Sequence, residues 1–257
     1  MTAQSAPTRG AFTRGAVVVV LAATLSIGAV TPRMAGASDG PSVTTTVPVV
    51  KCATGQGADS GPAARLPATM TVRVAASLTS SSALYVDRYD VVRMVGPKGW
   101  RCVASLAADG GEDLVIYLSG SPSPGFFHSL TGRSRATELT VQQEPACYSC
   151  CLALACPFFA AARALITSTY ASASMLAACR RPPGEVITDS TPSTRYFTDG
   201  PHVVGHAYPS GGPLRSLAVA YFGAATYSYV VSCTLPAGQR SLCRGALGWF
   251  VAHHRSI

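Results

Sequence analysis

The sequence predicts an α+β fold: an antiparallel β-rich domain with a few short helices, stapled by disulfides. Two groups of short apolar runs with a two-residue period indicate strands, one over residues 70–118 and one over residues 217–231. Between them, residues 147–179 are rich in Ala and Leu, which favours helices. All nine cysteines follow an N-terminal segment that has the pattern of an export signal, and oxidising compartments favour disulfides.

The chain begins with the pattern of a secretory signal peptide. Arg9 and Arg14 supply a positive region, and the apolar run 16–30 is shorter than the roughly 20 residues of a membrane helix. Small residues follow in the pattern that signal peptidase accepts, so we predict a signal peptide over residues 1–37 and a mature chain beginning at Ser38. An uncleaved membrane anchor is the alternative, because no sharp polar break follows the run.

Two further segments follow the signal. Residues 38–65 are polar, β-branched and interrupted by proline, with too little apolar surface to offset the entropy cost of ordering. They predict a flexible linker. Residues 66–257 have the length of one domain, and we predict a single α+β extracellular domain there.

The basic composition does not indicate nucleic-acid binding. The net charge is +8, but only Lys51 and Lys98 are lysines, and there is no asparagine. Both residues use A-rich codons, so their scarcity suggests a high-GC genome. The arginines are scattered, whereas a nucleic-acid interface needs them clustered with aromatic side chains.

The first half of the domain is predicted to be an antiparallel meander. The runs 70–74, 84–86, 91–95, 100–103 and 114–118 read as strands. The turn sequences 96–99 and 108–111 separate them, since Gly and Asp supply the backbone angles of tight turns.

The Ala-rich segment is predicted to hold two helices. Pro157 cannot lie inside a helix without removing a hydrogen bond, so Cys156 is expected to cap a helix that runs from Pro157 to about Ile166. A second helix is predicted over residues 170–179.

The last third is predicted to return to strands over 217–222 and 227–231 and to close on a helix started by Pro236. Its core-facing stripe repeats with the spacing i, i+4, i+7 and i+8 and consists of Leu242, Ala246, Trp249 and Phe250. His253 and His254 follow at the helix end, where a positive charge suits the helix dipole.

One disulfide is predicted from local structure. Cys233 ends a strand and Cys243 lies inside the following helix, so a bridge would close the corner between them. A loop of that size stabilises by roughly 2–3 kcal/mol in the chain-entropy model.

The other cysteines leave the connectivity open. The further disulfide candidates are Cys102, Cys147, Cys150, Cys151, Cys156 and Cys179, with Cys52 available as a partner. Four of them, between 147 and 156, could instead hold a metal ion or an iron–sulfur cluster. Export favours disulfides, so we predict no metal and no cofactor. Our working pairing joins Cys147 or Cys150 to Cys179, and Cys102 to a member of the cluster.

Catalytic signatures such as HExxH, the P-loop and GxGxxG are absent from the sequence. One Gly-rich segment, 205–212, holds both a base, His206, and a nucleophile, Ser210. Asp199 or Glu185 could orient the histidine. The alternative interpretation is a surface turn with a solvated His and Ser.

Three tyrosines alternate near the C-terminal strands. Tyr221, Tyr227 and Tyr229 could form a stacking face for a glycan, or they could belong to the core and the sheet surface.

A set of short motifs resembles a group of secreted, cysteine-rich proteins of high-GC Gram-positive bacteria. In order, the motifs are Gly99-Trp100-Arg101-Cys102, Ala108-Asp109-Gly110-Gly111, Ala155-Cys156-Pro157-Phe158, Pro209-Ser210-Gly211-Gly212, and Cys233-Thr234-Leu235-Pro236 with Leu242-Cys243. The resemblance implies that the Cys and Gly positions are framework, and it implies no activity. His206 stands where such proteins are expected to carry a small or acidic residue.

These observations predict an exported, disulfide-stabilised domain that is secreted or associated with the cell envelope. We expect non-enzymatic binding of an envelope component or a glycan, with no nucleic acid and no transmembrane span once the signal is removed. The alternative is a secreted hydrolase that uses His206 and Ser210.

Overall fold

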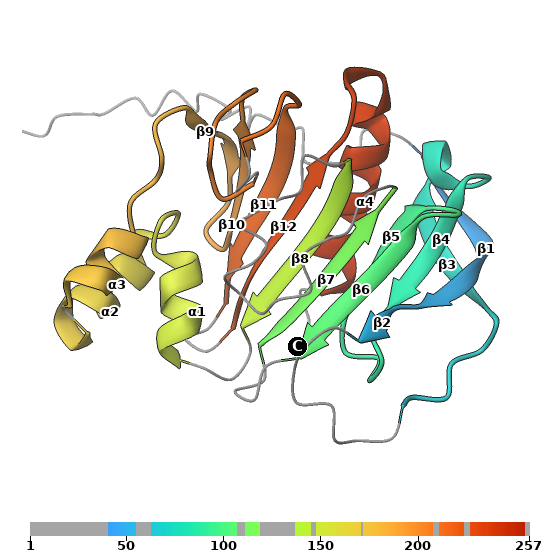
Figure 1. Ribbon diagram of the computed structural model, residues 1–257, viewed down its shortest axis with the longest axis horizontal. Helices are drawn as coiled ribbons and strands as arrows, with labels where there is room; N and C mark the ends of the chain where they lie inside the picture. The colour runs from blue at the N-terminus through green and yellow to red at the C-terminus, as the bar shows by residue number, and fades with distance from the viewer. Residues whose placement is uncertain are drawn as a thin grey trace, which may run out of the picture. The chain divides into compact units, whose positions relative to one another are not determined.

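The computed structural model describes residues 41–54, 63–106, 111–118, 137–144, 148–170, 172–207, 211–223 and 227–254. They belong to one compact unit of mixed sheets and short helices (Figure 1). With three disulfides among them, they confirm the predicted disulfide-stapled α+β fold. The predicted signal peptide, Cys147 and Ser210 lie outside the described residues. No helix in these ranges combines the length and the apolar character that crossing a membrane requires.

The smaller of two sheets has the strand order β3-β1-β4-β5. Its strands are β1 (Ser42–Lys51), β3 (Thr69–Ala75), β4 (Ser82–Val86) and β5 (Arg93–Pro97). β1 runs antiparallel to β3 and parallel to β4, and β4 and β5 form an antiparallel hairpin.

Strand β1 departs from the predicted flexible linker over residues 38–65. Its many Thr and Val residues are β-branched and suit a strand. Its backbone pairs on both sides, with β3 over its first part and β4 over its last. Val47 is buried in the core, and Cys52 is bonded to Cys102. The folded domain therefore begins before Leu66, because pairing with two neighbours compensates for the sparse apolar surface.

The larger sheet has eight strands in the order β2-β6-β7-β8-β12-β11-β10-β9. They are β2 (Ala53–Thr54), β6 (Arg101–Leu106), β7 (Glu112–Tyr117), β8 (Glu138–Glu144), β9 (Glu185–Ser190), β10 (Thr194–Asp199), β11 (Ser216–Phe222) and β12 (Ser228–Thr234). All neighbours are antiparallel except the short β2, which runs parallel to β6.

The predicted meander over residues 70–118 is split between these two sheets. The hairpin β4–β5 belongs to the smaller sheet and the hairpin β6–β7 to the larger one, while β1 lies between β3 and β4. Sequence alternation located the strands, but it carries no information on partners from distant segments.

Helix α4 (Arg240–His253) covers one face of the larger sheet and also contacts β3 and β5 of the smaller one (Figure 1). Its predicted stripe is confirmed, since Ala246 and Phe250 are fully buried and Trp249 nearly so. A short 3-10 turn, η2 (Ala237–Gln239), separates Pro236 from α4. A second such turn, η1 (Ala76–Leu78), follows β3 and packs against α4.

The opposite face of the larger sheet is covered by α1 (Tyr148–Ala155), α2 (Ala160–Thr169) and α3 (Ala173–Ala178) (Figure 1). Alternation along β12 serves both faces: Tyr229 and Val231 belong to the core under α4, and Val230 to the core under the short helices.

The boundaries of these helices differ from the prediction. Pro157 does not begin a helix but lies in the turn between α1 and α2. The N-cap residue of α2 is Phe159. Helix α1 was not predicted separately; Pro157 still acts as a breaker, because it follows the end of α1. The second predicted helix, over 170–179, corresponds to α3.

Candidate functional site

A cavity of about 420 Å³ lies beside the short helices, on the face of the larger sheet that they cover. Its walls come from β8, β12, α1, α3 and the two segments that follow α3 and β10. They include Gln142, Leu154, Ala177, Arg180, His206 and Val230. This volume lies within the roughly 300–1,000 Å³ of small-molecule sites, which are mostly apolar with a few polar groups.

The loop after β10 is held in place by a buried carboxylate. Asp199 is fully buried at the end of β10, and its Oδ2 accepts a hydrogen bond of 2.9 Å from the Ala207 N–H. Gly205 packs directly on this carboxylate, and a Cβ at that position would overlap its atoms. His202 adopts a left-handed backbone conformation, φ 62°, and its N–H donates to Gly212 O at 2.7 Å. The loop is therefore fixed at both ends of the segment that carries His206.

His206 is oriented by a second buried carboxylate. Its ring Nδ1 lies 2.9 Å from Glu185 Oε2, and its backbone N–H donates to the same oxygen at 2.8 Å. The Glu185 side chain is fully buried, whereas the His206 side chain is 26 % exposed. The rings of Phe158 and His206 pack in a T-shaped arrangement, with centroids 5.1 Å apart. The second ring nitrogen, Nε2, is the one left for a ligand.

The helical wall of the cavity is fastened by a disulfide and an arginine. Cys156, just after α1, is bonded to Cys179, just after α3. The Arg163 guanidinium donates to the carbonyls of Cys156 and Cys179 at 3.2 and 3.0 Å. Because Arg180 follows Cys179 directly, this clamp fixes the backbone of Arg180 at the cavity wall.

The predicted catalytic candidates fall into different roles. His206 lines the cavity, and Glu185, one of its two suggested orienting acids, binds it. Asp199 is wrong as the orienting group, since its carboxylate binds the loop backbone at Ala207 instead. Ser210 lies outside the described residues.

The local disulfide Cys233–Cys243 is confirmed, with its Cα atoms 5.5 Å apart. The other two working pairings are wrong: Cys179 is bonded to Cys156, and Cys102 to Cys52. The Cys102 pairing was missed because Cys52 lies in residues 38–65, which were predicted to be a linker outside the domain.

The cysteine cluster also contributes to disulfides through Cys150. Its neighbour Cys151 is fully buried and accepts a hydrogen bond from Ser228 on its carbonyl. The described residues contain no group of three or more His, Cys, Asp or Glu side chains that could hold a metal ion.

The three tyrosines do not form an open stacking face. Tyr221 and Tyr229 are stacked with centroids 4.9 Å apart, and Tyr227 contacts both. Tyr229 is fully buried against Phe250, and Tyr227 is 9 % exposed. The core interpretation therefore holds for Tyr227 and Tyr229, and a glycan cannot stack on them.

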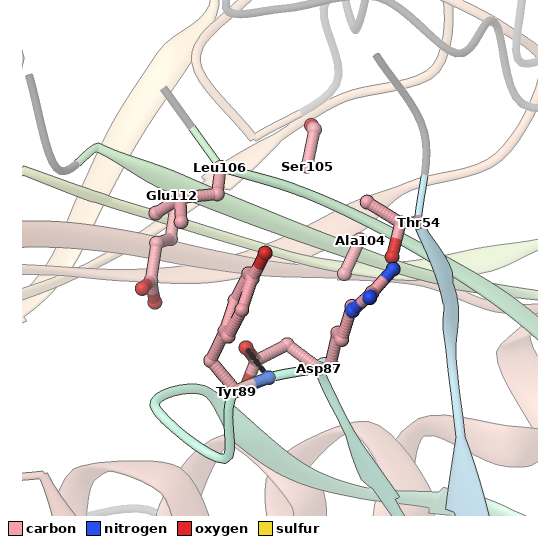
Figure 2. A pocket seen from close by; sticks show the side chains of 8 residues that line it. Thr54, Asp87, Tyr89, Ala104, Ser105, Leu106 and Glu112 are labelled. Atoms are coloured by element: carbon pink, nitrogen blue, oxygen red, sulfur yellow. Dashed lines mark hydrogen bonds between the residues drawn. The ribbon is translucent and has the colours of Figure 1, made fainter. Parts of the chain in front are cut away.

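A second, much smaller pocket lies between the β4–β5 loop and the edge of the larger sheet. In Figure 2 the ring of Tyr89 stands between Glu112 on one side and Ala104 and Thr54 on the other. Its volume of about 10 Å³ compares with the roughly 10–15 Å³ that one water needs, so it is too small for a ligand.

Glu112 at this pocket is a buried carboxyl with an unusual titration. Burial, followed by the charge of Asp87, raises its pKa to about 7. Gln143 Nε2 donates to Glu112 Oε2 at 2.7 Å and opposes the rise, and Tyr227 in turn donates to Gln143 Oε1. Asp87 accepts three backbone N–H groups of its own loop, and these hydrogen bonds fix the position of its side chain.

Comparisons with protein-family models, with curated proteins and with solved structures found no match for this chain.

Proposed function

We propose that this chain is an exported, disulfide-stabilised binding domain, and that its ligand-binding site is the cavity beside His206. The observation that carries the proposal is the cavity itself: about 420 Å³, walled mostly by apolar groups, with three polar side chains, Gln142, Arg180 and His206, facing it. Export is supported by the N-terminal signal pattern and by the disulfides, because oxidising compartments preserve such bonds.

A filled-cavity variant tests the binding site. A177W places a large ring from α3 into the cavity, and A164W places the same ring on the exposed surface of α2, away from it. The probe is 4-phenylbutan-1-ol, titrated into the isotope-labelled protein and followed by amide chemical shifts. We expect shifts at the cavity residues in the unaltered protein and in A164W, and their loss in A177W. Equal shifts in A177W, or shifts concentrated elsewhere, would place the site outside this cavity.

The export step has its own test. Expression of the full chain in a high-GC Gram-positive host should yield a protein in the medium or the cell envelope whose first residue is Ser38 by mass spectrometry. Retention in the membrane with an intact N-terminus would support the uncleaved anchor instead.

A secreted hydrolase is the second candidate, and the Glu185–His206 pair favours it. A buried carboxylate on Nδ1 holds the imidazole so that Nε2 can take a proton from a nucleophile, and it stabilises the imidazolium that forms. The nucleophile would be the Ser210 hydroxyl, whose oxygen attacks an acyl carbon while its proton passes to His206 and later to the leaving group.

The hydrolase is tested with p-nitrophenyl butyrate. Release of p-nitrophenol should disappear in S210A and H206A and fall in E185Q, and a fluorophosphonate probe should label Ser210. Hydrolysis that is absent in the unaltered protein, or unchanged in S210A, would rule out this candidate.

A further inference from the structure

The cavity beside His206 has a one-sided charge. Of its described lining residues, Arg180 and His206 are the two that can carry a positive charge, and none is acidic. Within the described residues, no carboxylate lies within ion-pair distance of the Arg180 guanidinium. A cation at the mouth of a mostly apolar cavity, without an internal counter-ion, is complementary to an anion.

Two buried carboxylates lie near the cavity, and of its two basic groups only His206 is paired with one of them, so Arg180 keeps its charge for a ligand. Glu185 lies behind the imidazole and accepts both the ring and the backbone N–H of His206. Asp199 is covered by Gly205 and binds the Ala207 N–H. A ligand in the cavity therefore meets the imidazole and the guanidinium, while the acids serve the loop that positions them.

The remaining walls of the cavity are apolar and favour a ligand with a hydrocarbon part. Leu154, Ala177 and Val230 present hydrocarbon from α1, α3 and β12. Val230 is only 6 % exposed, so the floor of the cavity lies against the core. Burial of a ligand's hydrocarbon against these groups is favourable by roughly 25 cal/mol per Å².

We propose that the cavity binds small amphiphilic carboxylates, with the carboxylate paired to Arg180 and the hydrocarbon part against Leu154 and Val230. The inference rests on the proposed binding function of the same cavity and assigns its ligand class. His206 Nε2 supplies a second polar contact on the wall, oriented by Glu185. A single guanidinium favours one carboxylate over a polyphosphate, which needs several donors.

Three probes with one hydrocarbon part test the assignment: 4-phenylbutanoate, 4-phenylbutan-1-ol and 4-phenylbutan-1-amine. We expect the carboxylate to bind roughly tenfold more tightly than the alcohol, as one charge-assisted pair gives, and the amine more weakly than the alcohol. Dissociation constants come from chemical-shift titration at neutral pH and low salt.

Two neighbouring arginines provide a matched pair of variants. R180Q removes the cation that lines the cavity, whereas R181Q removes an exposed cation that does not line it. R180Q should abolish the preference for the carboxylate over the alcohol, and R181Q should keep that preference. Neither side chain is buried, so both variants should fold.

The outcomes separate this inference from the proposed function. Equal binding of all three probes, lost together in A177W, would leave the binding site in place and overturn the carboxylate assignment. A carboxylate preference reduced equally by R180Q and R181Q would reveal general surface attraction and would also overturn it. Binding of none of the probes would contradict both proposals.

Discussion

Replacing Glu112 by Gln should remove one cause of the loss of folding stability at high pH. The carboxyl is 5 % exposed, and burial together with the charge of Asp87 raises its pKa from 4.5 to about 7. Gln has nearly the same shape and is always neutral, and its carbonyl oxygen can still accept the hydrogen bond from Gln143.

The sign follows from where the proton resides. Between about pH 4.5 and pH 7 the folded protein keeps a proton on Glu112 that the unfolded chain has already lost. The stabilisation from this group is therefore complete below pH 4.5 and is lost as the pH rises to about 7. At 1.36 kcal/mol per pKa unit, the loss is about 3 kcal/mol.

His254 has the opposite dependence in an overlapping range. It is buried and stacked on Phe250, and burial lowers its pKa from 6.5 to about 4. Its stabilisation is complete above pH 6.5 and is lost as the pH falls towards 4. The two slopes offset each other between about pH 4.5 and pH 6.5, so the contribution of Glu112 is visible only as a difference between variants.

The assay is urea unfolding of E112Q and of the unaltered protein, both with intact disulfides, at pH values from 4 to 8. The two proteins should be about equally stable at pH 4, where both side chains are neutral. At pH 8, E112Q should be more stable by about 3 kcal/mol. A stability difference that stays constant over the whole pH range would refute the assignment of a raised pKa to Glu112.

Three other perturbations have outcomes fixed by the structure. The double variant C233A/C243A should lose roughly 2–3 kcal/mol in urea unfolding, and an unchanged midpoint would contradict this. G205A forces a Cβ onto the Asp199 carboxylate and should cost about 1–3 kcal/mol in thermal unfolding, with the amide signals of the loop displaced; an unchanged loop spectrum would contradict the packing. H254F should flatten the loss of stability between pH 6.5 and pH 4, and an undiminished loss would assign it to another group.

The parts of the fold that were predicted from the sequence depend on local information. The hairpin β11–β12, the helix α4 and the Cys233–Cys243 bridge are neighbours in the chain, so periodicity and short spacing were enough to place them. The apolar stripe of α4 did not predict the close approach of η1 at Gly245. A Cβ at Gly245 would lie 2.9 Å from Leu78 Cδ1, so η1 packs closely against the helix there.

The parts that were missed depend on distant partners. Strand β1 looked like a linker because its stability comes from pairing with β3 and β4. The end of β1 pairs in parallel with β4, and the short β2 that follows runs beside β6, which brings Cys52 to Cys102. Period-two alternation describes the two faces of one strand, and it cannot give the neighbour that lies beside it.

The titratable groups show the same limit. His254 was interpreted as a cation at the end of a helix, where the dipole favours positive charge. In the fold it is 5 % exposed and stacked on Phe250 with ring centroids 3.7 Å apart. Burial outweighs the hydrogen bond to the Phe250 carbonyl, so it lowers the pKa to about 4 and the ring is neutral at pH 7.

The candidate site was only half visible for a related reason. His206 and its acid Glu185 could be named because a base in a Gly-rich loop needs a carboxylate, although the sequence did not choose between Glu185 and Asp199. The choice is made by β9 and β10, which pair so that Glu185 lies opposite Asp199. Both acids therefore reach the same loop. Gly205 packs on the Asp199 carboxylate, and the following residue, His206, binds Glu185. No sequence motif marked Arg180 as a site residue. Its position at the cavity follows from the neighbouring Cys179, and the disulfide partner of Cys179 became known only from the fold.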